Sequence, residues 1–333
     1  MKAPRVFDIN YIDSSSICAF ARCPAKYMLS RQLGLQKRDR MMLALDYGTD
    51  MHEAIPYCYK EETKQFAVDL FTKRWKAREP EYNDARNIEM AERTLMNFAN
   101  SHIDMCPYEI VEYEMTVANC EEISKNEVPF LIDIGGPLCL AGRIDAAVRW
   151  KSDGSLFALD YKTTREISPR FFSNFENSSQ AIAYTIALEQ IANEKVRGLI
   201  IEAIRVSKAK AESNMHIVFI KDHQIAEYIE FANKIAEQIL DCNDKQEWPI
   251  HCTGCAPYSS FGMPGYMCDF INICDAPNHE DMYKFFKQSE PFSPFKIDTP
   301  KFEDEIKNHC KPCVKADIGL PCEACEFKKD KEL

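Results

Sequence analysis

Two short segments of the sequence carry carboxylates and a lysine in an arrangement suited to phosphodiester hydrolysis. Asp145 ends one apolar run, and Asp160 and Lys162 end the next. Alternate residues of a strand share a face, so we expect Asp160 and Lys162 to point the same way. Two carboxylates held close repel each other unless a cation lies between them, and oxygen ligands suit Mg2+ or Mn2+. The lysine would position the attacking water or stabilise charge on the phosphate.

The same residues have a simpler interpretation as ordinary strand-end charges, because an aspartate two residues before a lysine occurs often by chance. The sequence around them therefore decides. Residues 151–154, Lys-Ser-Asp-Gly, form a good hairpin turn between the two apolar runs. If these runs pair, Asp145 lies beside Asp160 on the neighbouring strand.

The elements that position these residues follow from hydrophobic spacing. We expect helices at 14–33, 47–105, 178–193 and 223–242, and strands at 109–117, 138–150, 156–161, 196–206 and 215–220. Ser14, Ser15 or Ser16 is expected to cap the first helix. The order is helices, then a mixed sheet with helices, then a cysteine-rich tail, which predicts an α/β core with additions.

Four segments, in order, resemble the motifs of RecB-like nucleases of the PD-(D/E)XK type. They are Gly48-Thr49-Asp50-Met51-His52-Glu53-Ala54, Gly142-Arg143-Ile144-Asp145, Asp160-Tyr161-Lys162-Thr163 and Gln180-Ala181-Ile182-Ala183-Tyr184. The resemblance covers about residues 11–276. It implies a restriction-endonuclease-like mixed sheet flanked by helices, with a helical insertion. The proline of the family's Pro-Asp strand is absent, since Ile144 precedes Asp145.

The resemblance also implies roles for three further residues. His52 would be a metal ligand beside Asp145 and Asp160, and Gln180 and Tyr184 would line the catalytic site. Gln180 and Tyr184 are four residues apart and so share one helix face, and a neutral imidazole is a common metal ligand. The alternatives are that His52 is a surface or satisfied core residue and that Tyr184 only packs.

Four cysteines resemble the iron–sulfur branch of this family, which includes the AddB nuclease subunit and CRISPR-adaptation nucleases. The resemblance implies that Cys23 joins Cys255, Cys268 and Cys274 around a [4Fe–4S] cluster, for which four thiolates are needed. The last spacing, Cys268-x5-Cys274, matches the branch, whereas the preceding gap of twelve residues is longer than its commonest form. Cys252 is an alternative to Cys255, and zinc is an alternative to the cluster.

A second group of cysteines has the paired spacing of a tetrahedral Zn2+ site. Its members are Cys310, Cys313, Cys322 and Cys325. A segment this small buries too little surface to fold without metal. We expect it to dock a partner, DNA or the nuclease body, or to act only as a structural clip.

These patterns predict a domain organisation. Residues 1–276 form a nuclease domain closed by the first cysteine group, with a helical part at about 47–108 and a catalytic core at about 109–245. Residues 277–305 form a connector, and residues 306–328 form the small zinc-binding module.

Composition limits the function. The chain has 333 residues and a net charge of -11, from 52 acidic and 41 basic residues. This disfavours a protein that coats DNA non-specifically but permits an enzyme with a local basic groove. No secretory signal and no run of the ~20 apolar residues that span a bilayer is visible. We therefore expect a cytoplasmic protein without membrane contact, whose fifteen cysteines are metal ligands or thiols rather than disulfides.

Candidate DNA contacts follow the predicted catalytic strands. Arg165, Arg170, Lys208 and Lys210 are candidate phosphate contacts. Phe171, Phe172 and Phe175 could stack single-stranded bases, although such a run is more often a packing face.

Two functions remain. The first is a Mg2+- or Mn2+-dependent DNA exonuclease acting on single strands or DNA ends in recombination, repair or phage DNA processing. The second is a scaffold subunit of a recombination or CRISPR-adaptation complex. The clustered acidic residues favour the first. No helicase P-loop, Gly-x-x-x-x-Gly-Lys-Ser/Thr, is present, so a helicase, recombinase or single-strand-binding protein would be a separate partner.

Overall fold

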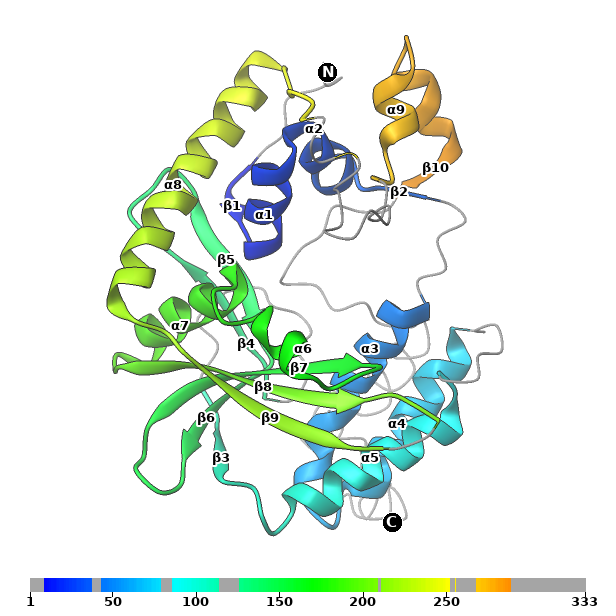
Figure 1. Cartoon of the computed structure of the whole chain (residues 1–333), viewed down its shortest axis with the longest axis vertical. Helices are drawn as coiled ribbons and strands as arrows, with labels where there is room; N and C mark the ends of the chain where they lie inside the picture. Colours follow the sequence, from blue (N-terminus) through cyan, green and yellow to red (C-terminus); the bar gives the residue numbers. More distant parts are fainter. Residues whose placement is uncertain are drawn as a thin grey trace, which may run out of the picture.

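A five-stranded mixed sheet forms the centre of the computed structural model (Figure 1), in the order β3-β6-β7-β8-β9. β7 and β8 run parallel, and the other neighbouring strands run antiparallel. The strands are β3 (Tyr108–Val111), β6 (Ala146–Trp150), β7 (Leu156–Thr164), β8 (Val196–Arg205) and β9 (Ser213–Phe219). The central strands β7 and β8 are almost continuously apolar because both faces of the sheet are covered.

The structure describes residues 9–37, 43–78, 86–113, 126–208, 211–251, 255 and 268–288. Cys252, Lys210 and the predicted zinc ligands Cys310, Cys313, Cys322 and Cys325 lie outside these residues. So does the greater part of the predicted connector.

Helices cover both faces of the central sheet (Figure 1). On one face lie α3 (Leu43–Ala54), the 3-10 helix η2 (Ile55–Tyr59), α4 (Lys64–Ala77) and α5 (Ile88–His102). On the other lie α1 (Ser14–Arg22), α6 (Pro169–Ser173), α7 (Ser179–Ala192) and α8 (Asp222–Lys245). Each face therefore has its own hydrophobic core, and the predicted α/β fold class is confirmed.

The prediction of one strand at 138–150 is wrong, because these residues form two strands in two different sheets. The chain forms β5 (Cys139–Ile144), which pairs with β1 (Tyr11–Ile12) and β4 (Val128–Ile132), and then β6 of the central sheet. The break falls at Asp145. Both strands are apolar, so hydrophobic spacing runs through the break and does not reveal the change of sheet. As a result Asp145 stands where the two sheets separate.

The prediction that a serine caps the N-terminal helix is wrong. The cap of α1 is Asp13, whose carboxylate accepts a hydrogen bond from Ser16 N at 2.8 Å, and not one of the three serines. An aspartate satisfies the free N–H groups of a first turn as well as a serine does. The single helix expected over 14–33 is also interrupted at Cys23, where the backbone is extended. It is followed by α2 (Pro24–Tyr27) and the π-helix η1 (Met28–Gln32).

The residues around and after Cys274 pack on the N-terminal part of the chain. α9 (Ile271–Asp275) and the 3-10 helix η4 (Glu280–Phe285) lead into β10 (Phe286–Gln288). β10 pairs antiparallel with β2 (Leu35–Lys37), and the Phe286 ring stacks on Phe270 at 5.6 Å. The described start of the predicted connector thus packs on the residues that precede it, and the domain boundaries stay predictions.

Two negative findings concern the described residues. None of the helices there is long and apolar enough to cross a membrane. No disulfide joins two of the cysteines in these ranges.

A buried ion pair fixes α3 against α4. The Asp50 side chain is fully buried, and its carboxylate accepts hydrogen bonds from Arg74 Nε at 3.0 Å and Arg78 Nε at 2.8 Å. Asp50 lies two residues before His52, so this contact also holds the part of α3 that approaches β7.

We expect Asp50→Ala to lower the free energy of unfolding by about 3–5 kcal/mol, because it removes the carboxylate that faces the buried Arg74 guanidinium. Chemical denaturation followed by circular dichroism measures this. The control is Asp69→Ala on the exposed face of α4, which should change stability by less than about 0.5 kcal/mol. Equal effects of the two substitutions would contradict the assignment.

Candidate active site

Asp160 lies at the centre of a buried group of polar side chains from β7 and α7. It is 1% exposed. Its Oδ1 accepts a hydrogen bond from Gln180 Nε2 at 3.0 Å, and Gln180 Nε2 also donates to Tyr184 OH at 2.9 Å. Its Oδ2 lies 2.6 Å from Lys162 Nζ. Asp160 and Lys162 therefore share a face of β7, as the strand alternation predicts.

Asp145 faces this group from the junction between the two sheets. Its Oδ2 accepts a hydrogen bond from Tyr161 N at 2.8 Å and lies 3.2 Å from His52 Nδ1. The His52 ring also contacts Tyr161 edge-on, with ring centroids 6.1 Å apart. The structure thus brings together all six residues that the sequence singled out: His52, Asp145, Asp160, Lys162, Gln180 and Tyr184.

The two carboxylates have opposite electrostatic surroundings. Burial raises the pKa of Asp145, but the neighbouring His52 and Lys162 outweigh it, and the pKa of Asp145 is lowered. For Asp160, burial is again the largest effect, and with the charge of Asp145 it raises the pKa of Asp160 despite Lys162. Asp145 thus holds its negative charge more firmly than Asp160, which binds a proton more readily.

The same carboxylates favour the charged forms of His52 and Lys162. Burial disfavours the charged form of His52, but the pKa of His52 is raised because Asp145 outweighs that cost. Burial likewise opposes the charge of Lys162, and Asp160 and Asp145 raise the pKa of Lys162 above its usual value. The site therefore pairs two acids with two bases.

Ion pairs take the place that a divalent cation would occupy. No group of three or more His, Cys, Asp or Glu side chains in the described part of the chain is arranged to hold a metal ion. The donor chemistry nevertheless fits one: Asp145, Asp160 and His52 offer oxygen and nitrogen ligands, and the buried Asp160 Oδ2 needs a positive charge beside it, which Lys162 Nζ supplies at 2.6 Å. Binding a cation there requires Lys162 and His52 to move from their present contacts.

Two glycines of the predicted motifs permit close approach at the site. A Cβ on Gly142 would lie 2.4 Å from the Phe130 ring, which crosses it from β4. The same ring packs edge-on against Tyr184 at 6.0 Å. A Cβ on Gly48 would lie 3.2 Å from Thr163 Oγ1, so the glycine brings α3 close to β7. Gly142 therefore supports Tyr184, and Gly48 supports His52.

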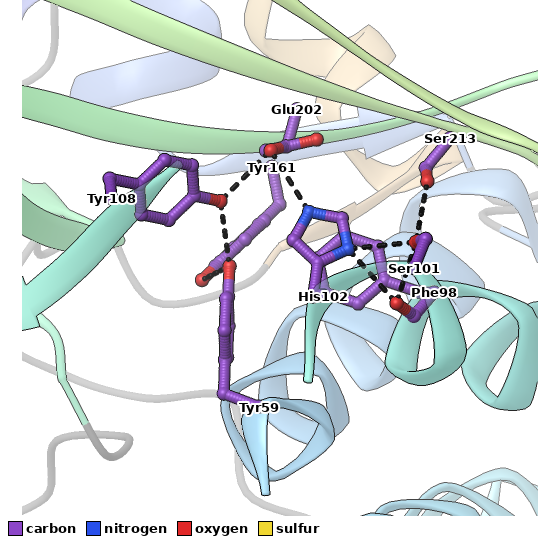
Figure 2. A network of polar contacts seen from close by, with 8 residues as sticks. All are labelled: Tyr59, Phe98, Ser101, His102, Tyr108, Tyr161, Glu202 and Ser213. Atoms are coloured by element: carbon purple, nitrogen blue, oxygen red, sulfur yellow. Dashed lines mark hydrogen bonds and ion pairs between the residues drawn. The ribbon is translucent and has the colours of Figure 1, made fainter. Parts of the chain in front are cut away.

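A buried hydrogen-bond network anchors β7 from the opposite face of the sheet (Figure 2). Tyr161 OH is 3.0 Å from Tyr59 OH, which is 3.0 Å from Tyr108 OH. Tyr108 OH donates to Glu202 Oε1 at 2.8 Å, and His102 Nε2 lies 3.2 Å from the same oxygen. The network joins η2, α5, β3, β7 and β8. Tyr161 N also donates to Asp145. By fixing Tyr161, the network therefore helps to position Asp145.

Hydrophobic spacing and the motifs do not predict this network. One signal was available, because Glu202 is a charged residue in the middle of the apolar run expected at 196–206. A charge in a strand buried on both faces requires a partner. Its partners, however, come from positions 94 and 100 residues away, which strand periodicity does not indicate.

The four cysteines of the first group are neighbours. Cys268 N donates to Cys255 O at 2.8 Å, and His251 N lies 3.5 Å from Cys23 Sγ. Burial raises the pKa of the Cys274 thiol to about 11, with further contributions from Cys23, Cys255 and Cys268. The thiols are close enough to interact electrostatically, but they do not form a ligand group as placed. Their role as ligands stays a prediction.

The comparisons with known proteins establish the family. A family model described as the PD-(D/E)XK nuclease superfamily matches residues 14–260. The chain belongs to the PD-(D/E)XK nuclease superfamily. The narrower assignment to its RecB-like, iron–sulfur branch stays a prediction. No curated protein matches the chain.

Two solved structures are similar to the chain. One is a provisionally described exonuclease from Eubacterium rectale, with 16% identity, 73% of this chain and 85% of the other covered, and a TM-score of 0.45. The other is SSO0001, with 13% identity, 70% and 79% coverage, and a TM-score of 0.31. Neither similarity bears on the reaction of this chain.

We expect Glu202→Ala to lower the free energy of unfolding by about 3 kcal/mol, because Tyr108 OH and His102 Nε2 both lose their buried acceptor. The measurement is urea denaturation beside Glu227→Ala, an exposed glutamate of α8. A loss at Glu202 no larger than at Glu227 would rule out the anchoring role.

Proposed function

We propose that the chain is a divalent-metal-dependent deoxyribonuclease that hydrolyses phosphodiester bonds, using Mg2+ or Mn2+. The observation that carries the proposal is the convergence of Asp145, Asp160, Lys162 and His52 from three separate elements. A buried carboxylate, Asp160, beside a half-buried one, Asp145, costs free energy in a fold with no use for them. A member of a nuclease superfamily can use such carboxylates to bind a cation.

Each side chain has a defined part in the proposed reaction. Asp145, Asp160 and His52 would hold the cation, which when bound activates water and neutralises negative charge on the phosphate. Lys162 would turn from Asp160 toward the phosphate or the attacking water. Gln180 orients Asp160 through its amide, and Tyr184 in turn fixes the Gln180 side chain.

The mode of attack and the biological setting are further parts of the proposal. We infer attack from DNA ends, on the resemblance of the four motifs to RecB-like nucleases. Recombination, repair and phage DNA processing all need such an enzyme. A strand-separating helicase, a recombinase or a single-strand-binding protein would be a separate partner. Thiols kept as metal ligands agree with a cytoplasmic location.

Asp160→Asn should lower the cleavage rate by at least about a hundredfold, because the substitution removes a charge needed for the cation but keeps an oxygen for Gln180. The assay follows end-labelled single- and double-stranded DNA with Mg2+, Mn2+ or EDTA. Asp241→Ala, on the exposed surface of α8, is the matched control and should cleave as the unchanged chain does.

Each outcome of this assay separates the two functions. Metal-dependent cleavage that Asp160→Asn abolishes supports the nuclease, and the released label gives its polarity. Full activity in Asp160→Asn would sink the proposed mechanism. An intact protein that cleaves neither form of DNA would instead favour the scaffold subunit.

We further propose two metal centres in the cysteine groups. Cys23, Cys255, Cys268 and Cys274 would hold a [4Fe–4S] cluster, with zinc as the alternative at the same thiols. The neighbouring positions of these four residues support this. Cys310, Cys313, Cys322 and Cys325 would hold Zn2+. The first centre would tie the N-terminal helices to the segment that follows α8.

Metal analysis of anaerobically purified protein distinguishes the two centres. Cys274→Ser should lose iron, lower the soluble yield and keep zinc, whereas Cys313→Ser should lose zinc and keep iron. Cys18→Ser, at an exposed cysteine of α1, should change neither content. Unchanged iron in Cys274→Ser would show that the first group is misassigned, and zinc in place of iron would favour the alternative metal.

A further inference from the structure

A cavity of about 500 Å3 lies between α6 and β9 and is not used by the proposed reaction. Its walls include Ser168, which caps α6, Phe172 within α6, Glu176 beyond it, and Asn214 and His216 from β9. The volume lies within the range of small-molecule sites in proteins. The cavity is therefore large enough for a nucleotide-sized group.

Strand register places this cavity on the catalytic face of the sheet. Asp160 is paired with Ile201, which is paired with His216, and Lys162 is related to Asn214 in the same way through Ala203. Directly paired residues share a face, and Met215 packs against the core on the opposite face. Because neighbouring strands lie about 4.8 Å apart, His216 and Asn214 lie about 10 Å from the catalytic pair.

His216 forms a preordered ring platform in this cavity. Its ring stacks on Phe172, with centroids 4.8 Å apart and an interplanar angle of 25°. Its Nε2 lies 2.8 Å from Glu176 Oε1. Phe172 is buried, whereas one third of the His216 side chain is exposed. Phe172 thus contacts one face of the imidazole and Glu176 contacts one edge. Because the ring is already ordered, less entropy is lost when a second ring stacks on its other face.

The polar groups of the cavity favour an uncharged ring over a phosphate. The Asn214 amide makes no hydrogen bond to any residue that the structure describes, so it can donate to and accept from a base edge. The Glu176 carboxylate would repel a phosphate in the cavity. Arg165 and Arg170, which are exposed on the chain between β7 and the cavity, are suited to contact the phosphates on either side.

We propose that this cavity binds an unpaired nucleobase of the DNA strand, stacked on His216. The proposal rests on the proposed deoxyribonuclease function and adds the form of its substrate. A base within a duplex has both faces covered by its neighbours, so a base that enters this cavity is unpaired. At about 3.4 Å for each stacked nucleotide, the distance to the catalytic pair places this base within about three nucleotides of the phosphate to be cleaved.

An abasic scan tests the proposal without requiring cleavage. Single strands with one abasic position, moved along the sequence, are bound to the Asp160→Asn chain, and affinity is measured by fluorescence anisotropy. We expect one position to weaken binding about tenfold, which corresponds to about 1.4 kcal/mol and lies within the range of base stacking on a ring. In His216→Ala on the same background, binding of the intact strand should fall by a similar factor, and sensitivity at that position alone should disappear.

Two variants guard the interpretation. His216→Phe keeps a stacking ring and should restore the sensitive position, which also separates stacking from a folding defect of His216→Ala. His223→Ala, at an exposed histidine of α8, should leave the scan unchanged. A scan that is identical with and without His216, or a chain that binds no single strand, overturns the proposal. Cleavage by the wild-type chain is scored separately, so a failed nuclease with a His216-dependent scan is distinguished from an active nuclease without one.

Discussion

The carboxylates of Asp160, buried in β7, and of Asp145, half-buried beside it, must be compensated, and the surrounding structure is organised by that requirement. Lys162, His52, Gln180 and the Tyr161 backbone N–H each offer a positive charge or a donor to Asp145 or Asp160. These groups come from α3, β7 and α7, so the electrostatic demand of two residues determines how three elements meet. The same demand explains how the chain can be stable with its acids and bases paired and still be suited to a cation, because both arrangements neutralise the carboxylates.

β7 serves two purposes through its two faces. Asp160 and Lys162 lie on the face that α7 covers, whereas Tyr161 between them faces α5 and the buried network (Figure 2). Tyr161 thus separates the two proposed catalytic residues of β7, and its backbone N–H donates to a third, Asp145. The network contains the buried carboxyl group of Glu202, which costs free energy unless it is hydrogen-bonded. It limits how far β7 can shift and so keeps Asp145 and Asp160 in register.

Much of the site could be predicted from the sequence because its residues obey local rules. Strand alternation places Asp160 with Lys162, helix spacing places Gln180 with Tyr184, and a hairpin turn places Asp145 beside Asp160. The parts that could not be predicted depend on contacts distant in the chain. The change of sheet at Asp145, the partners of Glu202 and the pairing of β10 with β2 leave no periodic signal. The cap at Asp13 could not be predicted for a different reason. Aspartate and serine are about equally good N-caps, so local preference does not distinguish Asp13 from the serines that follow it.

The pairing of β10 with β2, together with that of β1 with β5, has a consequence for how the protein is made. The first thirty or so described residues contact partners at 139–140, in α8 and at 286–288. They leave the ribosome well before these partners, and their last contacts appear only when residues 286–288 have been translated. At a synthesis rate of about 5–20 residues per second, this delay is on the order of tens of seconds. For much of that time the faces of α1 that pack on α7 and α8 are uncovered, so the N-terminal segment exposes apolar surface that chaperones can bind.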